Sequence, residues 1–279
     1  MNLRQALADA RNILADSNIE DASLEGEILL RHVMGVNRSQ LYSDLDFVLS
    51  SEHEKTLNLS LERRCQGEPT AYITGHREFY GLDFRVDRNV LIPRPESELL
   101  VELAVRLVRR QAVSSIADIG TGCGVIAISL AMNLPQVTIY ATDISPPALE
   151  VARSNCRRHG VADRVVLLQG DLLEPLTGPV DMIVANLPYV REDDLPRSGP
   201  LGFEPALALI GGKDGLDKIK SLCRQAGEKL NKGGCLLLEI GEGQAKAVFA
   251  ILREVYPAAT IEVHKDLAGF ERVVSLYLT

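Results

Sequence analysis

The sequence lacks the features of a membrane protein and of a secreted one. No apolar run in its 279 residues approaches the roughly 20 residues that a membrane-spanning helix needs. The amino-terminal stretch, residues 1–16, is polar and helix-patterned, and it lacks the apolar core of a signal peptide. We therefore expect a cytoplasmic protein with no membrane association.

The cysteines are few and scattered. None of the five belongs to a C-x-x-C pair, and no Cys/His cluster has metal-ligand spacing. We expect reduced, partly buried thiols and no bound metal. They are Cys65, Cys123, Cys156, Cys223 and Cys235.

Basic residues are also in the minority. The chain carries 30 Lys and Arg against 38 Asp and Glu, a formal charge of -8. Nonspecific nucleic-acid binding depends on phosphate neutralisation by Lys and Arg, so this balance argues against it. The acidic balance is compatible with a protein partner.

The first 70 residues predict a small helical domain. Leu3, Leu7, Ala10 and Leu14 fall on one face of a helix, and no strand pattern appears before residue 70. Farther along, Ser51 and Glu54 have capping-box spacing, which predicts that a helix begins there.

A β-hairpin linker is predicted for residues 71–95. This stretch is rich in aromatic and β-branched residues, with turn signals at Gly75 and Gly81. Ser97 then has the residue type and place of an N-cap for the helix expected at 98–110.

The remaining chain, residues 96–279, alternates between strand and helix patterns. This alternation predicts an α/β fold with a mainly parallel sheet covered by helices on both faces. Residues 190–213 are expected to be irregular. Two closing segments joined by a short loop predict an antiparallel edge pair. The expected strands cover 115–120, 137–143, 164–171, 181–186, 234–241, 259–265 and 271–279, and the helices 124–134, 146–160, 214–230 and 243–256.

A glycine-rich turn and an acidic residue indicate a nucleoside-cofactor site. Gly120, Gly122 and Gly124 follow the first parallel strand and precede a helix, where the backbone can approach a ligand closely. Asp143 ends the next strand, where a carboxylate can accept hydrogen bonds from ribose hydroxyls. A tight strand-to-helix turn without a ligand is the alternative.

The stretch Asn186-Leu187-Pro188-Tyr189 follows the strand at 181–186. Ligands of such sheets bind beyond the carboxyl ends of the strands, so this tetrapeptide is expected beside the cofactor. The Asn186 side-chain oxygen and the Leu187 carbonyl can accept the two N–H groups of a planar NH2 nucleophile. Pro188 stiffens the backbone and Tyr189 offers a ring face. An ordinary loop that ends a strand is the alternative.

The pattern D-x-G-x-G-x-G, which begins at Asp118, resembles motif I of class I S-adenosylmethionine methyltransferases, which have a Rossmann-like fold. The resemblance implies that the loop wraps the methionine part of S-adenosylmethionine and that Asp171 lies near the adenine. The cofactor-binding residues that it implies are Gly120, Thr121, Gly122, Cys123, Gly124, Asp143, Asp171, Leu172 and Asn186.

The tetrapeptide resembles the N/D-P-P-Y/F/W motif of methyltransferases that modify planar nitrogen, with Leu187 in place of the usual proline. That motif does not separate glutamine-N5 enzymes from adenine-N6 enzymes, and rRNA adenine dimethyltransferases carry a similar N-L/I-P-Y form. Residues 72–103, 202–217 and 239–244 resemble the release-factor glutamine methyltransferases, the PrmC/HemK family, and the similarity runs over nearly the whole chain.

This resemblance implies methyl transfer from S-adenosylmethionine to the side-chain amide nitrogen of the glutamine in the Gly-Gly-Gln motif of peptide chain release factors. It implies that Asn186, Leu187, Pro188 and Tyr189 are catalytic and substrate-binding, and that the helical domain docks the release factor. A purely structural cap is the alternative role for that domain. Adenine-N6 methylation of rRNA or DNA is the alternative activity, and a nucleoside-binding regulator without catalysis is the non-enzymatic alternative. Arg94 and Glu96 receive no chemical role, and Glu204 is expected to be either a loop anchor or a pocket wall.

Overall fold

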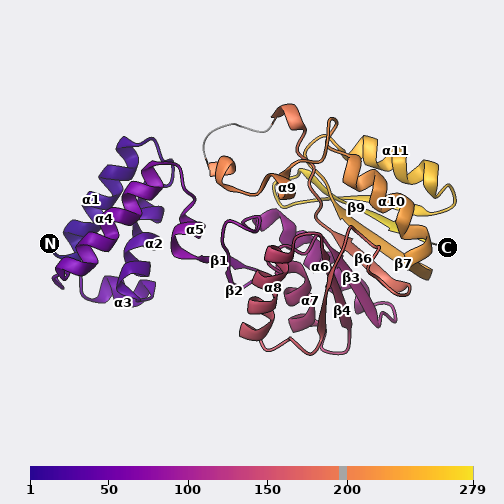
Figure 1. Ribbon diagram of the computed structural model, residues 1–279, viewed down its shortest axis with the longest axis horizontal. Coiled ribbons are helices and arrows are strands. Elements are labelled where there is room, and N and C mark those ends of the chain that lie inside the picture. Colours follow the sequence, from indigo (N-terminus) through magenta and orange to yellow (C-terminus); the bar gives the residue numbers. More distant parts are fainter. Residues whose placement is uncertain (195–199, 279) are drawn as a thin grey trace. The chain divides into compact units, whose positions relative to one another are not determined.

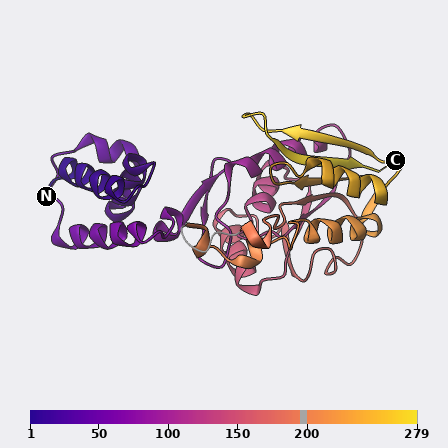
Figure 2. The same ribbon diagram turned by 90° about the horizontal axis from the view of Figure 1, so that it is seen from above.

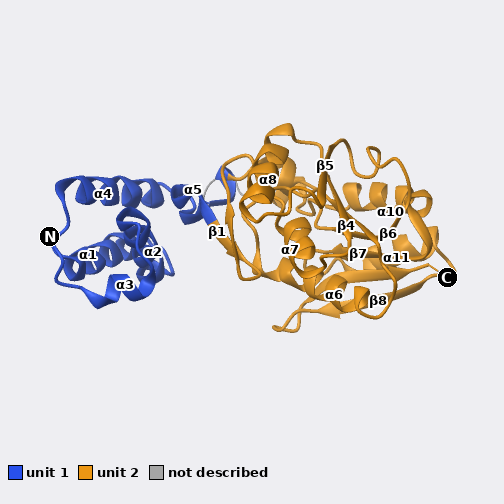
Figure 3. Cartoon of the chain, turned by 90° about the horizontal axis from the view of Figure 1, so that it is seen from below, with its two compact units in different colours: residues 1–76, 196–203 blue, residues 77–195, 204–279 orange. Residues whose placement is uncertain are grey.

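The computed structural model describes residues 1–194 and 200–278. These residues form two compact units (Figure 3). The first contains residues 1–76 with the turn at 200–203, and the second contains residues 77–194 and 204–278. No helix among the described residues is long and apolar enough to cross a membrane.

The first unit is helical, as its apolar spacing predicts. Its helices are α1 Leu3–Asp16, α2 Ala22–Met34, α3 Arg38–Ser43, α4 Ser51–Cys65 and α5 Thr70–Thr74. Leu3, Ala10 and Leu14 are buried along one face of α1, and Leu29 and Leu57 join them in one apolar core.

The predicted cap of α4 is wrong by one residue. The Ser50 side chain accepts a hydrogen bond from the His53 backbone N–H over 3.2 Å, so Ser50 is the N-cap and Ser51 is the first helical residue. Serine occupies both positions, and the capping-box spacing of Ser51 with Glu54 favoured the wrong one.

The predicted hairpin is shorter than its sequence suggests. Strands β1 His76–Phe79 and β2 Leu82–Arg85 form a two-stranded sheet that turns at Gly81, as expected. Gly75 does not belong to a hairpin turn. It ends α5 with a left-handed φ of 74°, a conformation that glycine adopts without strain.

The second unit contains the predicted mixed sheet (Figures 1 and 2). Its strand order is β5-β4-β3-β6-β7-β9-β8, parallel from β5 to β7 and antiparallel where β9 pairs with β7 and β8. The predicted closing pair is therefore confirmed. The strands are β3 Ser115–Ile119, β4 Thr138–Asp143, β5 Val165–Gln169, β6 Val180–Ala185, β7 Leu230–Glu239, β8 Thr260–Lys265 and β9 Glu271–Tyr277.

Helices cover both faces of this sheet, which confirms the predicted layers (Figure 1). On one face, α6 packs against α7 and α7 against α8, while α10 and α11 pack together on the other. The side chains of Ile119 and Ile183 share an apolar core with Ile219 of α10 and Val248 of α11. The helices are α6 Glu98–Val108, α7 Val125–Asn133, α8 Pro146–Arg158, α10 Asp217–Lys229 and α11 Ala245–Val255.

The segment predicted to be irregular, 190–213, contains short helical turns. They are η2 Glu192–Asp194, η3 Pro200–Phe203 and α9 Ala206–Leu209, and a further turn, η1 Pro95–Ser97, precedes α6. Residues 195–199 of the segment lie outside the described residues. Around the gap, Val190 forms a parallel bridge with Ile210, so the two ends of the segment lie side by side.

Candidate active site

Sheet register brings the predicted site residues to one edge. Ile119 pairs with Ala185 and also with Thr142, and Asp143 pairs with Gln169. The residues that follow these pairs therefore leave the sheet together: Gly120 after β3, Asn186 after β6 and Gly170 after β5. After β5 the chain crosses to the other side of β3 and forms β6, so the strand order reverses between β3 and β6. Sheets of this kind bind ligands at such a topological switch point, beyond the carboxyl ends of the strands.

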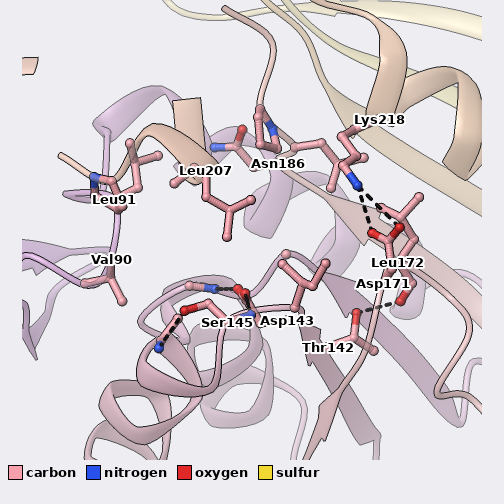
Figure 4. Close-up of a pocket in the computed structure, with 18 of the residues that line it drawn as sticks. Val90, Leu91, Thr142, Asp143, Ser145, Asp171, Leu172, Asn186, Leu207 and Lys218 are labelled. Atoms are coloured by element: carbon pink, nitrogen blue, oxygen red, sulfur yellow. Dashed lines mark hydrogen bonds and ion pairs between the residues drawn. The ribbon is translucent and has the colours of Figure 1, made fainter. Parts of the chain in front are cut away.

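A pocket lies at this edge, and Figure 4 shows most of the residues that line it. Its polar groups are contributed mainly by the strand ends, while Leu91 and Leu207 add apolar walls. The lining residues are Asn89, Val90, Leu91, Gly120, Gly122, Thr142, Asp143, Ile144, Ser145, Ala148, Gly170, Asp171, Leu172, Asn186, Leu187, Pro188, Pro205, Leu207, Ala208 and Lys218.

The glycine turn is held in left-handed backbone conformations. Gly120, Gly122 and Gly124 have φ values of 72°, 57° and 86°, which side chains rarely adopt. A β-carbon on Gly120 would also lie only 3.3 Å from Leu187 Cδ2, so the Leu187 side chain would have to shift slightly. The turn therefore keeps its backbone open to the pocket.

Asp143 joins the end of β4 to this turn. Its carboxylate accepts hydrogen bonds from the Gly122 and Ser145 backbone N–H groups, each over 2.9 Å. Burial raises the pKa of Asp143, and the hydrogen bonds from Ser145 and Gly122 oppose the rise. A carboxylate has about four acceptor positions, so ribose hydroxyls could still bind it.

Three residues of the predicted loop do not line the pocket. Thr121 is buried and donates to Asp118 over 2.7 Å, and Cys123 is buried with its carbonyl bound by Asn155. A β-carbon on Gly124 would contact Ile128 and Ala152, so this glycine lets the loop pack against α8. These residues therefore support the turn by packing and hydrogen bonding, and they do not face the pocket.

Asp118, two residues before the first glycine, is fully buried. Its carboxylate accepts from the Thr121 hydroxyl and from the Ala127 backbone N–H over 3.1 Å. Burial raises its pKa to about 7, and these two hydrogen bonds oppose the rise. Asp118 therefore ties the beginning of α7 to the turn.

Asp171 lies at the other end of the pocket, paired with a lysine that the sequence did not single out. Lys218 of α10 contacts the two Asp171 carboxylate oxygens over 3.0 and 3.3 Å (Figure 4). Leu172 is buried, with a left-handed φ of 50°, and its carbonyl accepts from the Thr142 hydroxyl over 2.9 Å. The hydrogen bond from Thr142 to Leu172 thus fixes the residues that follow β5, and Asp171 faces the pocket from there.

The tetrapeptide begins at the pocket and ends away from it. Asn186, Leu187 and Pro188 line the pocket, whereas the half-buried Tyr189 packs beside Gly241. Burial raises the pKa of Tyr189 to about 12, so its hydroxyl stays neutral at ordinary pH.

Backbone contacts from residues 209–217 brace the tetrapeptide. Gly211 donates to the Val190 carbonyl over 2.8 Å, and Val190 donates to the Leu209 carbonyl over 2.9 Å. A β-carbon on Gly211 would lie 2.4 Å from the Pro188 oxygen, and one on Gly215 would lie 2.3 Å from the Tyr189 oxygen. Only glycine permits these approaches.

Ser97 does not cap α6, contrary to the sequence-based prediction. Its side chain makes no capping hydrogen bond, and its hydroxyl oxygen instead accepts from Asn186 Nδ2 over 2.9 Å. A serine hydroxyl can either cap a helix or bind another side chain, so the residue type alone could not show which role Ser97 has.

Arg94 and Glu204 form an ion pair beside the pocket. Glu204 is buried, and it also accepts from the Ile92 backbone N–H over 3.0 Å. This carboxylate therefore joins the segment that carries Leu91 to the one that carries Leu207. Both segments supply pocket walls.

Comparison with known proteins identifies relatives for both units. Residues 5–75 match the model of the PrmC N-terminal domain, and residues 96–197 match that of the methyltransferase small domain. The release factor glutamine methyltransferase of Moorella thermoacetica is 43% identical over 279 residues, which cover 99% of each chain. That of Geobacter sulfurreducens is 41% identical over 275 residues, covering 98% of this chain and 95% of the relative.

Solved structures share the fold at low sequence identity. The 16S rRNA methyltransferase of T. thermophilus, solved in complex with AdoMet and guanosine, has a TM-score of 0.56 and 18% identity. The similarity covers 73% of this chain and 50% of that one. It supports the methyltransferase fold of the second unit.

Proposed function

The chain belongs to the release factor glutamine methyltransferase family, and on this basis we propose that it methylates the side-chain amide nitrogen of a glutamine in peptide chain release factors. The glutamine is that of the Gly-Gly-Gln motif, and the methyl donor is S-adenosylmethionine. The observation that carries the proposal is that Asn186-Leu187-Pro188 and the Gly120–Gly124 turn meet at one pocket.

The pocket residues fit the proposed cofactor. Asp143 offers a partly buried carboxylate to hydroxyl groups, and the backbone at Gly120 and Gly122 can approach the amino-acid part. Asp171 and Leu172 also line the pocket, and we propose them as the residues that contact the adenine. When bound, S-adenosylmethionine supplies a methyl group on a positively charged sulfur.

The tetrapeptide would hold the acceptor nitrogen. Asn186 Oδ1 and the Leu187 carbonyl accept its two N–H groups, which directs the nitrogen lone pair toward the methyl group. Pro188 stiffens the backbone, and the proposed ring contact of the planar amide with Tyr189 would lie outside the pocket lining, where Tyr189 packs beside Gly241. In this scheme the protein orients the reactants and provides no nucleophile of its own.

We assign docking of the release factor to the helical region, residues 1–70, with residues 71–95 as linker and 96–279 as the catalytic domain. The match of residues 5–75 to the PrmC N-terminal domain supports this assignment. The chain's formal charge of -8 supports a protein partner over a nucleic-acid substrate.

The proposal is tested by incubating the protein with radiolabelled S-adenosylmethionine and a release factor. The parallel reaction contains a release factor whose Gly-Gly-Gln glutamine is replaced by alanine. We expect label in the first protein and none in the second. Equal labelling of both, or label in rRNA or DNA without label in the release factor, would reject the proposed substrate.

A further inference from the structure

Glu239 is a buried carboxyl that the proposed reaction leaves without a role. It ends β7 at 2% exposure, and among the described residues its Oε2 has no hydrogen-bond partner. Because Ala185 pairs with Leu238, Glu239 lies level with Asn186 at the carboxyl edge of the sheet. A buried carboxylate with an unsatisfied oxygen is costly, which points to a functional reason for Glu239 at this place.

The carboxyl group of Glu239 contacts the site through Ser97 and Asn186. Burial raises the pKa of Glu239 to about 7, and hydrogen bonds with Ser97 and Asn186 oppose the rise. Ser97 is itself 3% exposed and accepts from Asn186 Nδ2. Its hydroxyl hydrogen is then free to point to the Glu239 carboxylate.

This arrangement decides which way the Asn186 amide faces. Its Nδ2 donates to the Ser97 oxygen, and the Glu239 carboxylate also interacts with this amide. With the amide flipped, Oδ1 and the Glu239 carboxylate would compete for the single Ser97 hydroxyl hydrogen, so one of these acceptors would lack a donor, which is unfavourable in a buried place. Among the described residues Asn186 Oδ1 accepts no hydrogen bond, so it is available to a ligand.

We propose that Ser97 and Glu239 are positioning residues that fix the Asn186 amide with its oxygen toward the substrate nitrogen. The inference rests on the proposed transfer to an NH2 group, which needs an acceptor at that place. Ser97 supplies the near acceptor, and Glu239 directs the Ser97 hydroxyl hydrogen away from Asn186.

Protonation of Glu239 would weaken this arrangement, because a protonated carboxyl brings a donor to the side where Asn186 already donates. The charged and titratable groups that face Glu239 are Glu96 of η1, Tyr189 after β6 and Arg272 of β9. Arg272 favours the ionised form and Glu96 opposes it. Turnover should therefore fall as Glu239 takes up a proton.

The test compares Ser97→Ala, Glu239→Ala and Glu239→Gln with wild type. We expect kcat to fall about tenfold in Ser97→Ala, the effect of one lost hydrogen bond, and about a hundredfold in Glu239→Ala, the effect of a misplaced reacting group. The KM for release factor and the calorimetric affinity for S-adenosylmethionine should stay within about threefold of wild type. Glu239→Gln keeps an acceptor oxygen but adds an amide donor, as the protonated carboxyl does, so its kcat should lie near the low-pH value of wild type and show no acid limb in the kcat–pH profile.

Ser129→Ala is the matched control. Ser129 is also fully buried, its hydroxyl has no partner among the described residues, and it lies on α7 outside the pocket lining. This variant should keep the wild-type kcat. If Glu239→Ala does not fold, Ser97→Ala decides the question alone, because it removes a single oxygen atom.

Wild-type kcat in Ser97→Ala, or an unchanged acid limb in Glu239→Gln, would overturn the positioning role. A wild-type protein that transfers no methyl group to release factor would instead overturn the proposed function. The two failures are therefore distinguishable.

Discussion

The Leu187 side chain packs directly against Gly120: a β-carbon built on Gly120 would lie 3.3 Å from Leu187 Cδ2. Leu187 is 3% exposed and belongs to the apolar core beneath α10 and α11. The cofactor turn and the tetrapeptide thus share one close contact. It also gives the leucine, which stands where relatives of the motif carry proline, a structural role of its own.

Replacing Gly120 by alanine should disturb both parts of the site. The new methyl group would press on Leu187, and the φ of +72° would strain an alanine by about 1 kcal/mol. We expect the affinity for S-adenosylmethionine, measured by calorimetry, to fall at least tenfold. Gly160→Ala is the control, because Gly160 has a φ of +66° but open space around it. Gly160→Ala should lose a similar amount of unfolding free energy and keep the wild-type affinity for S-adenosylmethionine. If both variants lost affinity equally, the Leu187 contact would not explain the loss.

Asp143 should make cofactor binding depend on pH. Its pKa is raised by burial, and only the ionised form offers all its acceptor positions to ribose hydroxyls. The affinity for S-adenosylmethionine should therefore be greatest well above that pKa and fall as the pH is lowered through it. Asp143→Asn should lower the affinity by about tenfold to a hundredfold, the effect of hydrogen bonds to a charged group.

A suitable control for Asp143→Asn is Asp214→Asn, which removes an exposed carboxylate paired with Lys220. That variant should bind the cofactor as wild type does and show the same pH profile. An Asp143→Asn protein with unchanged affinity at every pH would contradict the ribose-binding role.

Gly215 should be essential for the brace behind the tetrapeptide. A β-carbon there would lie 2.3 Å from the Tyr189 oxygen, so alanine must displace the backbone. We expect Gly215→Ala to lower the free energy of unfolding by about 2–4 kcal/mol, from left-handed strain and overpacking together. Gly233→Ala has the same kind of φ, +76°, in open space and should lose only about 1 kcal/mol. If urea denaturation showed equal losses of unfolding free energy in the two variants, the close approach of Gly215 to the Tyr189 oxygen would not contribute to stability.

Glu239 should make stability depend on pH. Its pKa is about 7 in the folded protein, above its usual value of 4.5, so its contribution to stability is complete below about pH 4.5 and is lost as the pH rises through about 7. Glu239→Gln lacks this loss. Its free energy of unfolding relative to wild type should therefore increase between about pH 5 and about pH 8. A constant difference across that range would show that the folded-state pKa is not raised.

Much of the fold could be predicted because local patterns agree with tertiary structure. The alternation of strands and helices after residue 115 and the apolar face of α1 both correspond to buried surfaces. The errors were local. Gly75 ends a helix of five residues, too short for a periodic pattern to reveal, and the capping-box spacing of Ser51 with Glu54 favoured Ser51 over Ser50, the serine that caps α4.

The candidate site was less predictable where distant segments meet. The turn residues and Asp143 have recognisable local sequence, and the structure brings Gly120, Gly122 and Asp143 to one pocket. Lys218 lies 47 residues from Asp171 and Ser97 lies 89 residues from Asn186, so no spacing rule joins these pairs. Glu239 looked like an ordinary strand-terminal acid until its burial was known.

The central claim is that the Asn186 oxygen and the Leu187 carbonyl direct one methyl group to the amide nitrogen of a release factor glutamine. The most direct test is fragmentation mass spectrometry of the Gly-Gly-Gln peptide after reaction with wild type and with Asn186→Ala. The account predicts a single methyl group on that glutamine with wild type. It predicts turnover lower by about 10² or more with Asn186→Ala, the scale of a key transition-state hydrogen bond. A methyl group on another residue, an unmodified peptide with wild type, or near-normal turnover by Asn186→Ala would contradict it.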